Sequence, residues 1–212
     1  MIDTFKKIIW DWNGTLFNDV KLSIEIMNNI LLRMKLKPLS YVDYKNIFTF
    51  PIKDYYSKAG LNFNEFSFEI ISREWIEQYE KRKFEGTLYE GVIEVLQFIS
   101  DKGIKQSIIS AYSQNMLFQI VSTFKLEHYF SYLAGLDNIY AESKIELGKE
   151  FMKNIVDKND EVLLIGDTVH DYEVAREIGA KCLLIAGGHQ SIEKLTACGV
   201  PVLNNIKEIY NY

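Results

Sequence analysis

Short apolar runs alternate with helical patterns along most of this chain, and this alternation limits the possible folds more than any other feature. Strands are predicted at residues 6–10, 106–110, 162–165 and 182–185, with shorter apolar runs at 132–134 and 200–203. Helical patterns lie between them, at 92–99, 115–124, 144–156, 172–178 and 191–197. Strands that are apolar on both faces and separated by helices indicate a parallel sheet covered on both sides. The fold class is therefore predicted to be α/β.

Residues 20–83 interrupt this pattern with a block that reads as helical throughout. Ile24, Met27, Ile30, Leu31 and Met34 recur at helical spacing, and Pro38 follows as a stop. Two further helices are expected at about 51–59 and 64–82. We therefore expect one α/β core made of residues 1–16 and 87–212, with an inserted helical domain at 17–86.

Bulk properties exclude several classes of function. The chain has 212 residues and a formal net charge of -5, which leaves no basic surface of the kind that nucleic acid requires. No apolar run approaches the length needed to span a membrane, so a membrane partner is not expected either. Cys182 and Cys198 are the only cysteines, and no secretory signal precedes them. We expect reduced thiols and a cytoplasmic protein.

Polar side chains follow the predicted strands where the sheet should end. Asp11 follows the first strand, Ser110 ends the second, and Asp167 follows the strand at 162–165, with Asp171 one helical turn further on. Lys144 opens the helix before that strand. Parallel strands bring such residues to one edge, where α/β sheets bind their ligands. Carboxylates can bind Mg²⁺ or attack phosphorus, and hydroxyl and ammonium groups can hold a phosphate.

Four short motifs in this order resemble the haloacid dehalogenase-like superfamily, in its phosphoglycolate phosphatase-like branch with a helical cap. They are "DWNGT" from Asp11, Ser110 in "SIISAYS", Lys144 in "AESKIEL", and "IGDTVHD" with Asp167 and Asp171. The segments "LYEGVIEVLQFISDKG" and "AKCLLIAGGHQSIEKLTACGV" extend the resemblance over nearly the whole core. The resemblance implies a Rossmann-like core with an inserted α-helical cap, and Mg²⁺ as cofactor.

The resemblance also implies a role for each residue. Asp11 would be the nucleophile and a metal ligand, joined by the backbone carbonyl of Asn13 and by Asp167, while Asp171 would act through water or orient its neighbours. Ser110 and Lys144 would hold the phosphate, with backbone N–H groups near Trp12 and Ala111. Lys53, in the first turn of a cap helix, would face the active site.

Ordinary structural roles stand beside these assignments. Asp171 suits a helix N-terminus, and Ser110 alone would be an unremarkable turn residue. Lys144 alone would be a solvated lysine, and Lys149 or Lys153 could take its proposed role of holding the phosphate. Lys53 reads equally well as a solvated lysine.

Asn13 stands where phosphatases of the family have a second aspartate, the general acid and base. Such help is worth about 10²–10⁴ in rate, and an amide can neither give nor accept that proton. We expect a magnesium-dependent phosphatase of a small phosphorylated metabolite such as phosphoglycolate, slow or limited to good leaving groups, acting as a monomer or homodimer. The alternatives are a phosphonoacetaldehyde hydrolase-like enzyme that uses Lys53, a non-catalytic binder of a phosphorylated ligand, and an asparagine introduced to silence the enzyme. The complete Asp167 and Asp171 pair argues against a dehalogenase.

Overall fold

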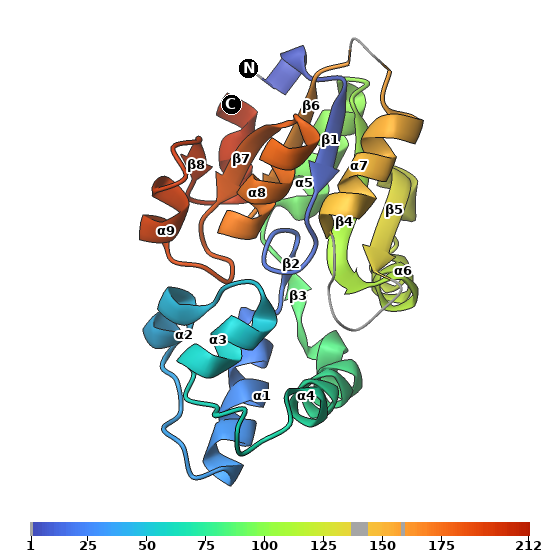
Figure 1. Ribbon diagram of the computed structural model, residues 1–212. Coiled ribbons are helices and arrows are strands. Elements are labelled where there is room, and N and C mark those ends of the chain that lie inside the picture. The colour runs from blue at the N-terminus through green and yellow to red at the C-terminus, as the bar shows by residue number, and fades with distance from the viewer. Residues whose placement is uncertain (1, 137–143, 158–159) are drawn as a thin grey trace.

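The computed structural model describes residues 2–136, 144–157 and 160–212, and places them in an α/β core with a helical block beneath it (Figure 1). Six strands form one sheet in the order β5-β4-β1-β6-β7-β8, and every neighbouring pair is parallel. The strands are β1 (Lys7–Trp10), β4 (Lys105–Ser113), β5 (Phe130–Leu136), β6 (Val162–Gly166), β7 (Lys181–Ile185) and β8 (Val202–Leu203). The predicted α/β class is confirmed.

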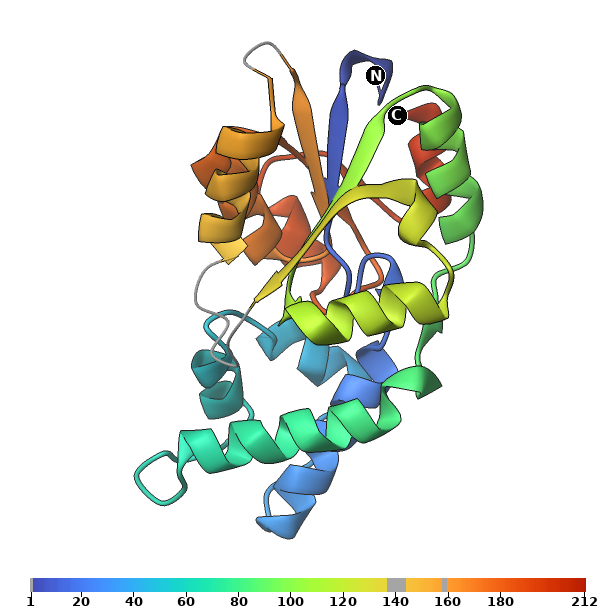
Figure 2. The same ribbon diagram turned by 90° about the vertical axis from the view of Figure 1, so that its right-hand side faces the viewer.

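Successive residues of a strand point to opposite faces of the sheet. Both sets are apolar here, so helices cover both faces. Ile8 and Trp10 of β1 belong to the hydrophobic cluster under α5 (Val92–Asp101), α6 (Gln114–Thr123) and the 3₁₀ helix η4 (Ile206–Asn211). Ile9 belongs instead to the cluster under α7 (Lys144–Ile155), α8 (Val169–Ile178) and α9 (Ile192–Thr196). Burying such a side chain contributes about 1.5–3 kcal/mol. Figure 2 shows the two helical layers on either side of the sheet.

The helical block has a hydrophobic cluster of its own, formed by α1 (Val20–Arg33), α2 (Tyr41–Ile47), α3 (Ile52–Lys58) and α4 (Phe68–Arg82). The chain leaves the core through β2 (Phe17–Asn18) and returns through β3 (Thr87–Leu88), after η2 (Lys83–Glu85). The two strands pair antiparallel, with Phe17 opposite Leu88. In Figure 1 the strand arrowheads of the core point toward the block, which therefore lies off the carboxyl ends of the sheet.

Several local features differ from the sequence-based expectation. The helix α2 was not predicted, because seven residues are too few for a clear periodicity, although Ser40 and Asp43 form a capping box at its start. The helix α4 begins at Phe68 instead of 64, because the Ser67 side chain caps it. The prediction that β4 ends at Ser110 is wrong: the strand continues to Ser113, past a shift in its register with β5.

Two short 3₁₀ helices, η1 (Ile2–Thr4) and η3 (Glu127–Tyr129), complete the elements described. Both cysteines are free thiols, Cys182 buried and Cys198 partly exposed. Among the helices that the structure describes, none combines the length and the apolarity that crossing a membrane would need.

Candidate active site

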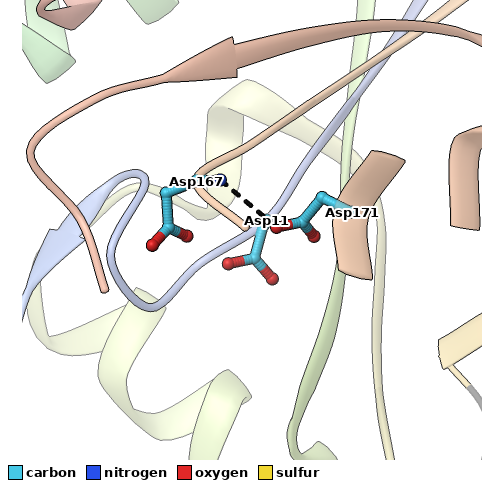
Figure 3. A group of neighbouring side chains, drawn as sticks. All are labelled: Asp11, Asp167 and Asp171. Carbon is cyan, nitrogen blue, oxygen red and sulfur yellow. Dashed lines mark hydrogen bonds between the residues drawn. The ribbon is translucent and has the colours of Figure 1, made fainter. Parts of the chain in front are cut away.

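Three buried carboxylates meet at the carboxyl edge of the sheet. Asp11 follows β1, Asp167 follows β6, and Asp171 lies in the first turn of α8. The strands β1 and β6 are neighbours, and the Asp11 N–H donates to the Ile165 carbonyl across 2.9 Å. One ligand oxygen from each carboxylate lies within 4.8 Å of the others. Figure 3 shows the three side chains next to one another at this edge of the sheet.

Hydrogen bonds from nearby backbone and side-chain groups hold two of these carboxylates in place. Asp171 Oδ2 accepts from the N–H groups of Asp167 (3.2 Å) and Thr168 (3.0 Å), and Thr168 caps α8. Asp167 accepts from the Thr15 hydroxyl at 3.1 Å and from the His189 N–H at 2.6 Å. Asp171 is therefore both a helix-capping residue and a member of the site.

Glycine is required beside Asp167 because the backbone passes very close to its carboxylate. A Cβ built on Gly14 would lie 2.4 Å from Asp167 Oδ2, and one built on Gly188 would lie 2.1 Å away. Gly14 also has a φ of +80°, a conformation that glycine adopts at little cost. The glycine of "DWNGT" therefore leaves room for a carboxylate that comes from a distant strand.

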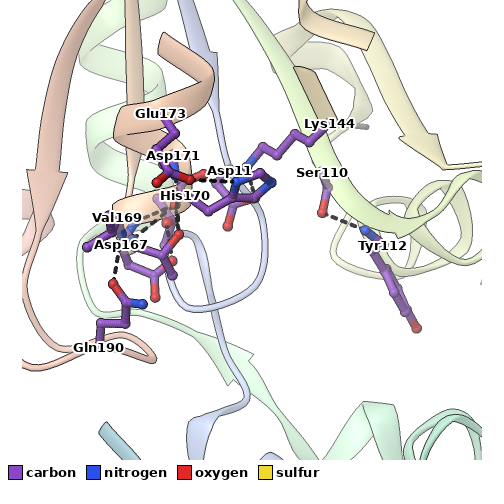
Figure 4. A network of polar contacts seen from close by, with 12 residues as sticks. Asp11, Ser110, Tyr112, Lys144, Asp167, Val169, His170, Asp171, Glu173 and Gln190 are labelled. Atoms are coloured by element: carbon purple, nitrogen blue, oxygen red, sulfur yellow. Dashed lines mark hydrogen bonds and ion pairs between the residues drawn. The ribbon is translucent and has the colours of Figure 1, made fainter. Parts of the chain in front are cut away.

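Lys144 connects the carboxylates. Its ammonium donates to Asp11 Oδ1 and to Asp171 Oδ1, at 2.5 Å each, and the side chain is buried (Figure 4). The alternatives lie at the surface, since Lys149 pairs with Glu146 on an exposed face of α7 and Lys153 is exposed. The structure thus brings Lys144, and not its neighbours, to the strand-end aspartates.

Burial sets the charge of this cluster. It raises the pKa of Asp11 to about 7, although Lys144 opposes the shift, and it raises the pKa of Asp167 to about 6. Burial acts in the same direction on Asp171, but the Lys144 charge and its hydrogen bonds outweigh it and lower that pKa. When all are ionised, three carboxylates and one ammonium leave two negative charges. An all-oxygen donor set with this excess fits a hard divalent cation such as Mg²⁺.

The phosphate-holding residues predicted on β4 lie on the adjacent strand. The register pairs Trp10 with Ile108, so Ser110 lies next to the end of β1. Ser110 is buried, its hydroxyl accepts from the Tyr112 N–H at 3.1 Å, and Ala111 is half-buried. Figure 4 shows Ser110 on β4 and its hydrogen bond with Tyr112.

The Asn13 side chain does not turn toward Asp11. Its amide donates to Asp19 Oδ2 at 2.9 Å and to the Tyr79 hydroxyl oxygen at 2.7 Å. The Tyr79 hydroxyl in turn donates to Asp19 Oδ2 at 2.7 Å. Sequence reasoning missed Asp19, because an aspartate before a helix looks like an ordinary N-cap, and it missed Tyr79, which lies 66 positions from Asn13.

His189 joins the same network from the core side. Its Nε2 lies 3.2 Å from Asp19 Oδ1, as an ion pair more than an aligned hydrogen bond, and its Nδ1 lies 2.7 Å from the Tyr44 hydroxyl. Burial acts to lower the pKa of His189, but the Asp19 charge outweighs it and raises that pKa to about 9. Burial acts to raise the pKa of Asp19, but the His189 charge and the hydrogen bonds lower it. A buried, charged pair therefore bridges the core and the helical block.

Lys53 makes its described contacts within the helical block. It is exposed on α3, with its ammonium 5.6 Å from the ring centre of Phe63 and 5.7 Å from that of Phe68. Aromatic residues of the block approach the site instead. The Phe48 ring stacks on His189 with 4.9 Å between centres, and the Phe50 ring lies 4.8 Å from that of His170.

This chain matches one protein-family model and several solved structures. The family model described as "haloacid dehalogenase-like hydrolase" matches residues 8–185. A haloacid dehalogenase-like family hydrolase of Streptococcus pneumoniae superposes with a TM-score of 0.84 at 17% identity, covering 100% of this chain and 99% of that one. A search of curated proteins finds no match.

Two further solved structures carry different functional names. A predicted phosphoglycolate phosphatase of Haemophilus somnus has a TM-score of 0.76 at 18% identity, with 98% and 97% of the two chains covered. Protein tyrosine kinase A of Mycobacterium tuberculosis has a TM-score of 0.81 at 17% identity, with 98% and 97% covered. At such identities the likeness shows a shared fold, so an activity has to be argued from the site.

Proposed function

This chain belongs to the haloacid dehalogenase-like hydrolase family, and we propose that it is a magnesium-dependent phosphatase acting on a small phosphorylated metabolite through Asp11. One observation carries the proposal. Asp11, Asp167 and Asp171 converge at the edge of the sheet, Lys144 pairs with Asp11 and Asp171, and the cluster keeps an excess of negative charge. That arrangement suits a divalent cation and a nucleophilic carboxylate better than a purely structural ion pair.

The residues divide the proposed reaction between them. An oxygen of Asp11 attacks phosphorus, the phosphoryl group moves to the carboxylate, and the bond to the leaving oxygen breaks. Water then attacks the phosphorus, which frees phosphate and restores Asp11. Ser110, Lys144 and the backbone N–H of Ala111 hold the phosphoryl oxygens. The carboxylates of Asp11 and Asp167 and the carbonyl of Asn13 would hold Mg²⁺, oriented by Asp171, and the ion would neutralise charge on the phosphoryl group.

Residues 17–86 would act as a cap that covers this edge and selects the leaving group. The aromatic residues Phe48 and Phe50, which contact histidines beside the site, support that role. Phosphoglycolate is the first substrate to test. We further propose that the protein is cytoplasmic and acts as a monomer or homodimer. The contacts described for Lys53 stay within the helical block and give the Schiff-base alternative no support.

A panel of phosphate monoesters, assayed with Mg²⁺ and with chelator, tests the proposal. We expect hydrolysis that depends on Mg²⁺, and faster turnover of aryl than of alkyl esters, because a nitrophenolate leaves without needing a proton. Binding of tungstate or vanadate with Mg²⁺, together with no hydrolysis of any ester, would instead indicate a binding protein.

Magnesium binding should strengthen as the pH rises. The folded-state pKa of Asp11 is about 7, above the usual 3.8 of an aspartate, so stability from this group is complete below about pH 4 and is lost as the pH rises through 7. A bound cation requires the ionised carboxylates and opposes that loss. We expect calorimetry to give a Mg²⁺ affinity at least about tenfold higher at pH 8 than at pH 5.5. Equal affinities would contradict this, and Asp167→Asn should lose most binding at both pH values.

A further inference from the structure

Asn13 and Asp19 contact each other where the chain passes from the core into the helical block. Asn13 belongs to the loop after β1, Asp19 precedes α1, and the short strand β2 lies between them. Asp19 is buried and Asn13 is half-buried. The 2.9 Å contact between the Asn13 amide nitrogen and Asp19 Oδ2 is therefore largely shielded from water.

Tyr79 closes the contact into a triangle. Its hydroxyl oxygen accepts from the Asn13 amide at 2.7 Å, and its proton goes to Asp19 Oδ2 at 2.7 Å. Tyr79 is buried in α4 on the returning side of the helical block. We call these three side chains the Asn13–Asp19–Tyr79 triangle. It ties the nucleophile loop to both ends of the helical insertion.

The proton count in this triangle requires an amide at position 13. The amide supplies two N–H donors and the tyrosine one O–H donor, which makes three donors for the three contacts. A carboxylate at position 13 would remove two of these donors. It would also place two carboxylates next to each other at a buried point, where like charges are costly. The identity of Asn13 is thus complementary to Asp19.

We propose that Asp19 is a positioning residue that requires an amide at position 13, and that the Asn13–Asp19–Tyr79 triangle fixes the helical block over Asp11. The amide at position 13 and the carboxylate at position 19 are then a matched pair. Its effect on turnover rests on the proposed phosphatase function, but the triangle itself does not.

Swapping the two residue types should therefore restore the stability that either single substitution loses. In the double variant Asn13→Asp/Asp19→Asn, the new amide nitrogen at position 19 can donate to the new carboxylate and to Tyr79. Its carbonyl oxygen can still face His189 Nε2, which lies 3.2 Å from that position in the unmodified protein. The three contacts of the triangle are therefore restored with donors and acceptors reversed.

Thermal unfolding of four proteins tests the triangle: the unmodified chain, Asn13→Asp, Asp19→Asn and the double variant. Each single change should lower the melting temperature by on the order of 5–10 °C, since it leaves buried polar groups unpaired. The double variant should recover at least half of that loss. Asn18→Asp is the matched control: the same substitution on an exposed neighbour should shift melting by less than about 2 °C.

Turnover separates positioning from a purely structural role. Asn13→Asp alone should hydrolyse alkyl phosphates no faster than the unmodified protein, because its new carboxylate faces Asp19. The double variant restores the three contacts, which again hold the side chain at position 13 against position 19 and Tyr79, so its kcat should return toward that of the unmodified protein.

Additive melting losses, or a single Asn13→Asp variant as stable as the unmodified protein, would overturn the proposal. If Asn13→Asp yields no folded protein, folding of the double variant supports it and continued failure to fold overturns it. Coupled melting temperatures without hydrolysis of any phosphate ester would leave the triangle standing and refute the phosphatase function.

Discussion

Replacing Asp11 with asparagine should reduce Mg²⁺-dependent phosphatase turnover by at least about 10⁴-fold, because an amide cannot take the place of an attacking carboxylate. The fold should survive the change. Burial raises the pKa of Asp11, so the folded chain disfavours its ionised form, and a neutral isostere removes that penalty. Lys144 keeps its second partner, Asp171. We therefore expect a melting temperature within a few degrees of the unmodified protein.

Burst kinetics with an aryl phosphate provide the measurement. The unmodified protein should release aryl product rapidly as the acyl phosphate forms and then more slowly as it breaks down, whereas Asp11→Asn should show neither phase. Asp54→Asn, on an exposed site of α3, makes the same substitution without touching the carboxylate cluster and should turn over normally. Activity of Asp11→Asn within tenfold of the unmodified protein would rule out Asp11 as the nucleophile.

Replacing Lys144 with methionine should have the largest effect on stability of any change at the site. It removes the ammonium that lies 2.5 Å from both Asp11 and Asp171, and it leaves two buried carboxylates without a countercharge. Removing one partner of a buried ion pair typically lowers the free energy of unfolding by about 3–5 kcal/mol. For a chain of this size that is a fall of roughly 10 °C in melting temperature. Turnover should fall as well, because Lys144 is proposed to hold the phosphate.

The same variant gives a pH signature with a definite sign. Without Lys144 the pKa values of Asp11 and Asp171 should rise, so the variant should be more stable at pH 5 than at pH 8. Lys149→Met, on the exposed face of the same helix, should melt within about 2 °C of the unmodified protein at either pH. If Lys144→Met and Lys149→Met melt alike, Lys144 does not neutralise the cluster.

The sequence was sufficient to predict a parallel sheet and the meeting of its strand-end residues, and the reason is geometric. Parallel strands place the residues that follow them at one edge, so Asp11, Ser110 and Asp167 could be brought together from their positions after apolar runs. The sequence was insufficient where local signals were short. The seven-residue α2 lacked periodicity, and β4 continued beyond Ser110 because a strand can shift register with its neighbour and still pair.

Side-chain partners were decided only by the packed chain. The sequence could show that position 13 holds an amide, but not that Asp19 and Tyr79 share its hydrogen bonds, because Tyr79 reaches it from α4 across the helical block. Likewise, nothing local separates Lys144 from Lys149, yet one is buried between two carboxylates and the other lies on the surface. Hydrogen bonds act over about 3 Å, whereas a sequence pattern sets only the face and the end of an element. The way the helical block packs on the core brings these groups within hydrogen-bonding distance, and it therefore determines which of them meet beside Asp11.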